Sequence, residues 1–385
     1  MNDLKIVKIE LFKVPPRWLF LKITTQLGII GWGEPVVEGK TDSVAACIKE
    51  LEKFIIGRNA NEIEDIWQIL YRGGFYRGGA ILMSAISGID QALWDIKGKH
   101  LNVPIHELLG GAVRNKMKMY CWIGGDNPDV VLEQAHEKVK DGFKAVKMNA
   151  TGAMEWVSSI KDVKTVVNNI KLLREEFGYD LDIGLDFHGR VHKPMVKRLI
   201  DELAPYEPMF IEEPVLTENN DALKHIYGYT SIPIATGERM FSRWDFKEIL
   251  HQGVVDIIQP DLSHAGGISE VRRIAAMAEA YDITLAPHCP LGPVALASCL
   301  HVDFVSANAI IQESSIGIHY NKGYDILDYM SNPEVFNIKD GYIELLKKPG
   351  LGVEIDEDKL REAQKIGHDW SNPIWRHEDG SFAEW

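Results

Sequence analysis

Three acidic residues end strand-like segments at a regular interval. Asp186 closes IGLD, Glu212 closes MFIE and Glu238 closes PIATGE, with 26 residues from the first to the second and 26 from the second to the third. A βα unit of a (β/α)₈ barrel has about 30 residues, and the barrel gathers the C-terminal ends of its strands on one face. One such acidic residue alone is more often a helix N-cap, so the evidence for a site is the interval that all three share. Three carboxylates in this register would meet at a barrel mouth and supply the oxygen ligands that suit Mg²⁺.

Two histidines follow segments of the same kind. Side chains alternate along a strand, so Asp186 and His188 are expected to point to the same side. Asp261 follows VDIIQP and His288 follows ITLAP, at the ends of adjacent predicted strands. A carboxylate beside an imidazole orients the ring, fixes its tautomer and raises its basicity, as a general base requires. Most single histidines are structural, but two at such strand ends indicate a base, His288 with Asp261, and a separate acid, His188.

This combination of groups suits one class of reaction. Removing the proton next to a carboxylate creates a dianion, which a cation bound at that carboxylate stabilises as the charge develops. One base and one separate acid then describe the β-elimination of water from a hydroxy acid. Glu313 ends the last predicted strand and joins the candidate site.

The elements that must position these residues alternate along the chain. Strand-like segments are followed by helical ones, and the eight predicted strands lie at residues 118–124, 143–149, 182–188, 209–214, 233–238, 255–261, 283–288 and 307–313. Eight repeats favour a closed barrel over an open doubly wound sheet. No glycine-rich phosphate fingerprint follows the first strand, so a nucleotide-binding fold has no local support.

The residues before the barrel have a different pattern. Residues 4–13 and 19–24 alternate apolar and polar positions, whereas helical spacing begins at Thr41. A buried helix that is apolar on most faces is expected over Ile81–Lys99. Strands followed by helices indicate an α+β module. Its segment Tyr71–Gly79 holds four glycines, and it is either an ordinary loop or a lid that brings Arg72, Tyr76 or Arg77 to a substrate.

Composition limits the classes of protein to which the chain could belong. Its 385 residues are enough for two domains, and with 45% hydrophobic and 25% charged residues they are typical of a globular protein. No stretch approaches the roughly 20 apolar residues of a membrane span. The N-terminus lacks a signal-peptide core, and the four cysteines show no metal-type spacing, so we expect a cytoplasmic protein with reduced thiols. A net charge of −14 argues against nucleic-acid and anionic-membrane partners.

Long motifs spread over the whole chain resemble one known family. The chain is similar to the enolase superfamily, in particular its mandelate racemase subgroup and the D-galactonate dehydratase family within it. The motifs that carry the resemblance are PPRWLFLKI, GWGEPV, GFYRGG, SGIDQALWDIKGK, GLDFHGR, FIEEPV, GERMFSR, QPDLSHAGG, LAPHCPLGP, GIHYNKG, KPGLGVEID and WRHEDGSFAEW. The resemblance implies a modified, TIM-like (β/α)-barrel of the α/β class with an N-terminal α+β capping domain. It also implies a homo-oligomer, an octamer in much of the family.

The resemblance also implies roles for the candidate residues. Asp186, Glu212 and Glu238 would hold one Mg²⁺ per subunit. His288, assisted by Asp261, would be the base, and a histidine base with Mg²⁺ is a known arrangement in this superfamily. His188 would be the acid, and Glu313 would hydrogen-bond the substrate carboxylate. The implied reaction converts D-galactonate, a small-molecule sugar acid, to 2-dehydro-3-deoxy-D-galactonate.

One departure from the racemase pattern separates two reactions. Racemases of the subgroup carry two lysines one residue apart at the end of the second barrel strand, whereas this chain has Lys147 and Asn149. Asparagine removes the second base, so elimination is favoured over racemisation. A dehydratase or a racemase or epimerase for another sugar acid, and a non-catalytic sugar-acid binding protein on the same scaffold, remain the alternatives. We expect substrate-binding residues at Lys147, Asn149, Arg17, Tyr76 and Arg77.

Three segments follow from these patterns. Residues 1–112 are expected to form the capping domain, with lid loops near 15–20 and 71–79, and residues 113–325 the barrel with the site. Residues 326–385 are expected to pack back on the capping domain.

Overall fold

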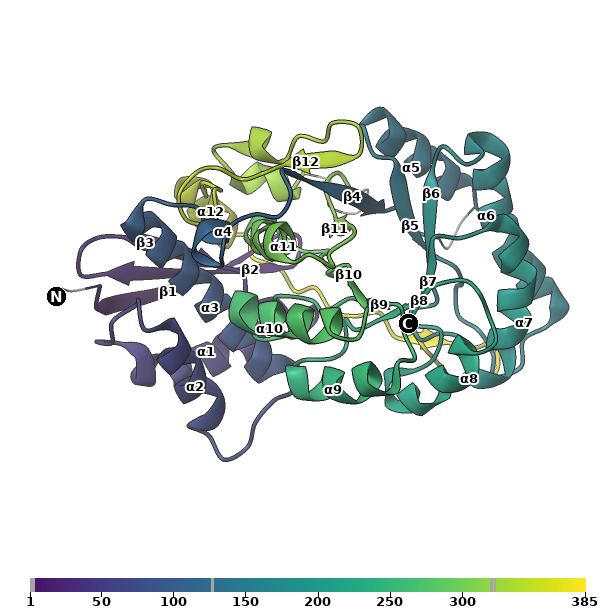
Figure 1. The fold of residues 1–385 in the computed structure, drawn as a ribbon, viewed down its shortest axis with the longest axis horizontal. Helices are drawn as coiled ribbons and strands as arrows, with labels where there is room; N and C mark the ends of the chain where they lie inside the picture. Colours follow the sequence, from purple (N-terminus) through teal and green to yellow (C-terminus); the bar gives the residue numbers. More distant parts are fainter. Residues whose placement is uncertain (1–3, 126–127, 319–320, 322) are drawn as a thin grey trace.

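A computed structural model describes residues 4–125, 128–318, 321 and 323–385 (Figure 1). His319, Tyr320 and Lys322 of the GIHYNKG motif therefore lie outside the described residues. Within the described part of the chain, no helix is both long enough and apolar enough to cross a membrane.

The N-terminal module joins an antiparallel sheet to helices. Strands β1 (Ile6–Val14), β2 (Trp18–Thr25) and β3 (Ile30–Gly33) pair in sequence order. Helices α1 (Thr41–Ile55), α2 (Ile63–Arg72), α3 (Ala80–Leu101) and the short α4 (Ile105–Leu108) follow. The apolar sequence of α3 is explained by its position, because it packs on the sheet, on α1 and on the barrel helix α10, and is buried on most sides.

The second module is a ring of eight parallel strands. Each strand from β4 to β9 pairs with the next along the chain, and β11 pairs with β4. Leu285 in β10 also bridges Ala309, just before β11, which closes the ring. The strands are β4 (Lys116–Trp122), β5 (Ala145–Asn149), β6 (Asp182–Asp186), β7 (Phe210–Glu212), β8 (Ile234–Thr236), β9 (Ile257–Ile258), β10 (Thr284–Leu285) and β11 (Gln312–Ser314).

Helices alternate with these strands and lie outside the ring (Figure 1). They are α5 (Pro128–Lys140), α6 (Ile160–Phe177), α7 (Lys193–Leu203), α8 (Leu223–Tyr227), α9 (Arg243–Gln252), α10 (Gly267–Glu279) and α11 (Pro293–Val305), with short 3-10 turns at Ala204–Tyr206 and Thr217–Ala222. The prediction of a modified barrel with an N-terminal capping module is confirmed.

The inside of the ring is packed rather than open. One buried cluster takes residues from successive strands and their ends: Tyr120, Ala145, Phe210, Ala235, Ile257, Ala286 and Ile311. Large and small side chains share the space, and a Cβ at Gly184 of β6 would lie 2.7 Å from the Phe210 ring. Glycine at this position therefore admits the phenyl ring, and the packed layer supports the strand ends that carry the candidate site.

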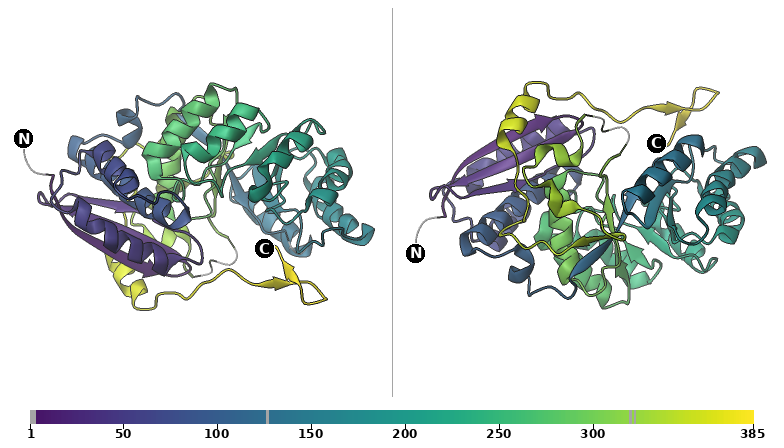
Figure 2. Two further views of the ribbon diagram at one scale, coloured as in Figure 1. Left: turned by 90° about the horizontal axis from the view of Figure 1, so that it is seen from below. Right: turned by 90° about the horizontal axis from the view of Figure 1, so that it is seen from above.

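The chain after β11 returns to both modules. Short 3-10 turns at Ile326–Tyr329 and Pro333–Phe336 lead to β12 (Tyr342–Glu344), which pairs antiparallel with β4. Helix α12 (Glu357–Gln364) packs on β1, as expected for a segment that returns to the capping module. The rest continues as an extended segment to the barrel, with a hairpin of β13 (Trp375–Arg376) and β14 (Phe382–Ala383) (Figure 2).

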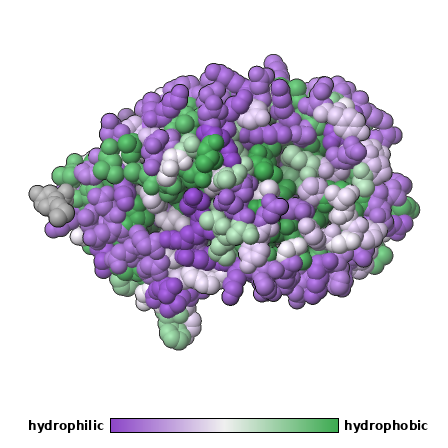
Figure 3. Space-filling view, viewed as in Figure 1, coloured by the Kyte–Doolittle hydropathy of each residue, from purple (hydrophilic) through white to green (hydrophobic). Residues whose placement is uncertain are grey.

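The two segments expected as lid loops differ in form. The first is only a turn over residues 15–17, because β2 begins at Trp18 and is buried along almost its whole length. The second, residues 73–79 between α2 and α3, projects from the molecule (Figures 1 and 3).

Candidate active site

The three carboxylates with the regular spacing converge on the C-terminal face of the barrel. Asp186 and Glu212 are the last residues of β6 and β7 and lie in register, and Glu238 follows β8 by two residues. Each offers a carboxylate oxygen, and these oxygens all lie within 4.8 Å of one another. The shared interval in the sequence thus corresponds to three adjacent strand ends.

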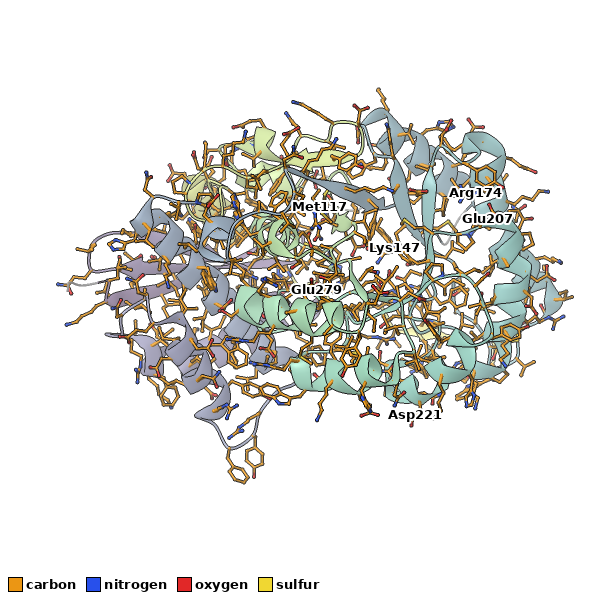
Figure 4. The ribbon with its side chains drawn as sticks, in the orientation of Figure 1. Met117, Lys147, Arg174, Glu207, Asp221 and Glu279 are labelled. Atoms are coloured by element: carbon orange, nitrogen blue, oxygen red, sulfur yellow. The ribbon has the colours of Figure 1, made fainter. Side chains whose placement is uncertain are left out.

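Lys147 supplies positive charge to this cluster from inside the barrel (Figure 4). Its Nζ lies 2.9 Å from Glu212 Oε1 and 3.0 Å from Glu313 Oε1, and the side chain is almost completely buried. Burial lowers the pKa of Lys147, but the carboxylates of Glu212 and Glu313 outweigh it, so the pKa lies well above its usual value. The ammonium group therefore stays charged and holds two carboxylates at once.

The three carboxylates fit a divalent cation. Burial, together with the charges of Asp186 and Glu238, raises the pKa of Glu212 well above its usual range despite the opposing effect of Lys147. The protein's own cations thus leave part of the negative charge of this cluster uncompensated. An all-oxygen donor set of this kind is the set that Mg²⁺ prefers. Gln259 Nε2 donates to Glu212 Oε2 at 2.7 Å and fixes the direction of that carboxylate, as outer-shell partners of metal ligands do.

His288 is held as a base would be. It follows β10 by three residues, and its Nδ1 lies 2.9 Å from Asp261 Oδ2 on the neighbouring strand end. The other oxygen of Asp261 accepts the backbone N–H groups of Ser263 at 2.8 Å and His264 at 3.1 Å, so the carboxylate is fixed as well. The ring therefore has one nitrogen bound to Asp261 and the other, Nε2, directed to the carboxylate cluster.

The charge around His288 favours proton uptake. Nε2 lies 3.1 Å from Glu238 Oε2 and 3.9 Å from Glu313 Oε2. Burial lowers the pKa of His288, but Glu238, Glu313 and the hydrogen bond with Asp261 outweigh it and place the pKa well above its usual value. Glu313 is itself fixed from two sides, by Lys147 and by the backbone N–H of Cys289, which donates to its Oε2 at 2.9 Å.

His188 reaches the site by a different route from the one that strand alternation predicts. Strand β6 ends at Asp186, and His188 lies in a turn with a left-handed backbone, φ +52°. Its backbone N–H donates to Asp186 Oδ1 at 2.6 Å. The prediction assumed that the strand continues to His188, and this assumption is wrong. The Asp186 carboxylate caps a turn, and this turn sets the direction of His188.

The two imidazoles approach from opposite sides of the ring. His188 follows β6 and His288 follows β10, and four of the eight strand-to-strand steps separate these strands. The charges of both histidines contribute to lowering the pKa of Glu238, which follows the strand midway between them, although burial opposes them. The structure thus places two imidazoles on either side of one carboxylate cluster.

The residues expected to bind substrate divide into two groups. Asn149 ends β5 beside Asp186, and its Oδ1 accepts the Trp122 indole N–H at 3.1 Å. Arg17 is buried against the segment after His288, where its Nη2 donates to the carbonyl of Pro290 at 2.9 Å. Lys147, Asn149 and Arg17 therefore lie in or beside the site.

Tyr76 and Arg77 are not brought to the site. They lie in the projecting segment 73–79, where Tyr76 is 88% exposed and its ring packs on Phe75. Arg77 is also exposed, and its Nε lies 3.5 Å from the carbonyl of Gly74 in the same loop. Their assignment to substrate binding stays a prediction.

Sequence reasoning missed one residue that anchors the segment after His288. Glu34, at the end of the capping sheet, accepts backbone N–H groups of Gly292 at 2.6 Å, Val294 at 3.1 Å and Ala295 at 3.0 Å. These groups open α11, directly after the loop that carries His288. The motif GWGEPV marks a strand end, but no pattern in the sequence indicates a partner more than 250 residues away.

Two family models match the chain over most of its length. Residues 15–110 match the N-terminal domain of mandelate racemase/muconate lactonizing enzymes, and residues 130–359 match the enolase C-terminal domain-like family. The two matches correspond to the capping module and to the barrel with the strand ends described above.

Solved structures with similar chains carry related names. An enolase of Agrobacterium radiobacter, provisionally named a galactarate dehydratase and bound to Na and L-malate, is 32% identical, with a TM-score of 0.89 over 99% of this chain and 100% of that one. A provisionally named dehydratase of Mesorhizobium loti is 31% identical, with a TM-score of 0.88 over 94% and 98% of the two chains. A mandelate racemase/muconate lactonizing enzyme of a Sulfitobacter species is 28% identical, with a TM-score of 0.88 over 98% and 99%.

Proposed function

Because the chain belongs to the mandelate racemase/muconate lactonizing enzyme family of the enolase superfamily, we propose that it is a Mg²⁺-dependent dehydratase of a sugar acid, D-galactonate. The observation that carries the proposal is the pair of imidazoles on opposite sides of one carboxylate cluster, His288 bound to Asp261 and His188 on its own turn. Each has a position suited to one half of an elimination.

His288 is suited to removing the proton from C2 of the acid. In the neutral ring, with the Nδ1 proton donated to Asp261, Nε2 has a lone pair directed toward the carboxylate cluster. When Nε2 takes the proton, the imidazolium is stabilised by Asp261, whose second oxygen is held by two backbone N–H groups. The residue therefore acts as base, with Asp261 as the group that orients it.

His188 is suited to the second half of the reaction. It donates a proton to the C3 hydroxyl, which leaves as water while the electron pair from the C2–H bond forms the C2–C3 double bond. The resulting enol takes up a proton at C3 and becomes the 2-keto acid. The products are therefore one 2-dehydro-3-deoxy acid and one water for each substrate molecule.

The remaining charged groups act on the substrate carboxylate. When Mg²⁺ is bound at Asp186, Glu212 and Glu238, it offsets the negative charge that develops there as the proton leaves. Lys147 holds Glu212 and Glu313 in fixed directions through its two ion pairs. We assign Glu313, which shares Lys147 with Glu212, to contact with the substrate carboxylate, as the resemblance implies.

Asn149 favours elimination over racemisation. A racemase needs a second base on the face of the substrate opposite His288, and an amide cannot take a proton at neutral pH. In this chain Asn149 ends β5, and its side chain accepts a hydrogen bond from the indole of Trp122 on β4. The inverting group of a racemase is therefore absent from this strand end.

One observation supports the choice of D-galactonate, and a second names a rival acid. The long motifs resemble the D-galactonate dehydratase family across both modules. The Agrobacterium radiobacter relative, 32% identical, is provisionally named for galactarate, a sugar acid with a second carboxylate. Aldonic and aldaric acids are therefore the two classes to compare.

The test is a product assay. The purified protein is incubated with Mg²⁺ and a panel of aldonic and aldaric acids, and 2-keto acid is measured. We expect the strongest signal from D-galactonate. Keto acid from a different acid and none from D-galactonate would refute the substrate, and no keto acid from any member of the panel would refute the dehydratase.

A further inference from the structure

The segment after α12 spans both modules and reaches the site. Trp370 lies against the capping module, with the Arg17 guanidinium 5.8 Å from its ring centroid. Farther along, the Arg190 guanidinium lies 4.6 Å from the Trp375 ring, and His377 Nδ1 lies 3.2 Å from Glu155 Oε1. Arg190 and Glu155 both belong to the barrel, so the segment is attached at both ends of its path (Figure 2).

The hairpin in this segment delivers Trp385 to His188. The last strand, β14, ends two residues before Trp385, and the neighbouring Ala383 is buried. The rings of Trp385 and His188 lie 5.7 Å apart between centroids at an interplanar angle of 85°, an edge-to-face contact. Trp370 also packs against Trp385, with 6.2 Å between ring centroids, so the indole is itself supported.

His188 needs such a contact because little else fixes its ring. His288 is held by a carboxylate at Nδ1, whereas Nδ1 of His188 is buried and has no hydrogen-bond partner among the described residues. The hydrogen bond from His188 to Asp186 is made by the backbone N–H of His188, so it leaves the side-chain torsions open. The direction of the ring is therefore set by packing, and Trp385 provides the aromatic contact.

We propose that Trp385 is the positioning residue for the acid of the reaction, and that the segment Trp370–Trp385 brings it there as part of the active site. The role of the acid rests on the proposed function, but the packing of Trp385 on His188 does not. Two measurements separate these parts.

The first measurement is independent of catalysis. Diethyl pyrocarbonate acylates imidazole nitrogens, and mass spectrometry of peptides gives the modification rate of each histidine. In Trp385→Ala we expect His188 to be modified at least about fivefold faster, while His288 changes less than twofold. Trp385→Phe, which keeps an aromatic ring, should restore most of the protection. Phe382→Ala is the matched control, since Phe382 lies in the same hairpin and is exposed.

The second measurement separates the acid step from the base step. In deuterated water, substrate recovered before completion reports exchange at C2, and keto acid reports elimination. A misplaced acid slows elimination but leaves proton removal possible, so the ratio of exchange to elimination should rise at least about tenfold in Trp385→Ala, since small displacements of a reacting group cost up to about 100-fold. Trp385→Phe should lie near the native ratio.

Several results would overturn the proposal. Unchanged modification of His188 in Trp385→Ala would show that the indole does not hold the ring, whatever the reaction. An equal fall of exchange and elimination would show a general structural role. If Trp385→Ala does not fold, Trp385→Leu replaces it. Equal modification rates of His188 in Trp385→Leu and Trp385→Phe would contradict the role of an aromatic contact. A native protein that makes no keto acid would refute the proposed function but leave the modification result to be judged separately.

Discussion

Two histidines of one site differ in what holds them. Asp261 fixes the ring of His288 by a hydrogen bond of 2.9 Å, whereas His188 stands on a left-handed turn and packs on Trp385. A base must keep one tautomer so that its lone pair faces the substrate, and a carboxylate partner ensures it. An acid that gives up its proton to a departing hydroxyl depends more on direction than on a fixed tautomer.

This difference predicts different losses. His288→Asn should abolish both exchange at C2 and elimination, because no other base faces the α proton. His188→Asn should lower elimination by at least about 100-fold, as expected for loss of a general acid, yet leave exchange at C2 measurable. Proton NMR of recovered substrate and keto acid in deuterated water gives both rates. Loss of exchange in both variants would argue against separate roles.

The carboxylate cluster makes a prediction about metal binding. Glu238→Gln removes one negative charge from the three ligands while keeping the shape of the side chain. Replacing even an outer partner of a metal ligand costs about 10- to 100-fold in affinity, so Mg²⁺ should bind at least about tenfold more weakly, measured by titration calorimetry. Glu248→Gln, on the exposed face of α9, is the control. Equal affinities of native protein and Glu238→Gln would remove Glu238 from the ligand set.

At the scale of elements, the strand ends and the start of α11 together build the site. The ends of three adjacent strands bring carboxylate oxygens of Asp186, Glu212 and Glu238 within 4.8 Å of one another. The loop that carries His288 is not fixed by a strand, and Glu34 from the capping sheet anchors its far end through three backbone N–H groups. The capping module therefore helps to fix the segment that carries His288.

Removing this anchor should destabilise the protein. In Glu34→Ala, three buried backbone donors at the start of α11 lose their acceptor. A buried donor left without an acceptor costs about 1–3 kcal/mol, with incomplete additivity, so the free energy of unfolding should fall by about 3 kcal/mol in urea titrations. Glu50→Ala, exposed on α1, should change it by less than about 0.5 kcal/mol. A Glu34→Ala variant as stable as the control would contradict the anchoring.

The same helix carries a histidine that predicts a pH dependence of stability. Burial lowers the pKa of His301 to about 3, and its neutral ring bonds the carbonyl of Leu351 through Nε2 and accepts the backbone N–H of His106 at Nδ1. In the unfolded chain a histidine takes up its proton near pH 6.5. Between these values only the unfolded chain binds the proton, so this contribution to stability is present above about pH 6.5 and is lost as the pH falls toward about 3.

The change of the free energy of unfolding with pH tests this prediction. One such group lowers the free energy of unfolding by at most about 1.4 kcal/mol for each pH unit. Urea titrations of the native protein and of His301→Gln at pH 7, 6 and 5 should show a smaller loss in the variant, because carboxylates contribute equally to both. Identical slopes in the two proteins would show that His301 is not the group responsible.

At the scale of the whole molecule, the sequence predicted the barrel, the capping module and the three strand-end carboxylates, because strand period and βα interval are local signals. It did not predict that β6 stops at Asp186 and that a turn aims His188, because the carboxylate cap competes with the strand pattern. It also could not show that residues after α12 reach the barrel. The contacts of Trp375 and Trp385 join residues far apart in the chain, and no spacing encodes them.

The projecting segment 73–79 carries a prediction about assembly. Phe75 and Tyr76 are 90% and 88% exposed, and apolar side chains exposed together mark contact surfaces. We expect a homo-oligomer, with a sedimentation mass well above the 43.4 kDa of one chain, that dissociates in part when both residues are replaced by Ser. Tyr179→Ser, an exposed aromatic on the barrel, should leave the mass unchanged. A native protein that sediments at 43.4 kDa would contradict the assembly.

The most direct test of the central claim follows the native protein with D-galactonate and Mg²⁺ in deuterated water by NMR. A base and a separate acid predict a 2-keto-3-deoxy acid with one deuterium at C3, formed as the substrate disappears. Deuterium at C2 of an unchanged or epimerised acid, with no keto acid, would contradict the claim, because it would show proton removal without loss of water.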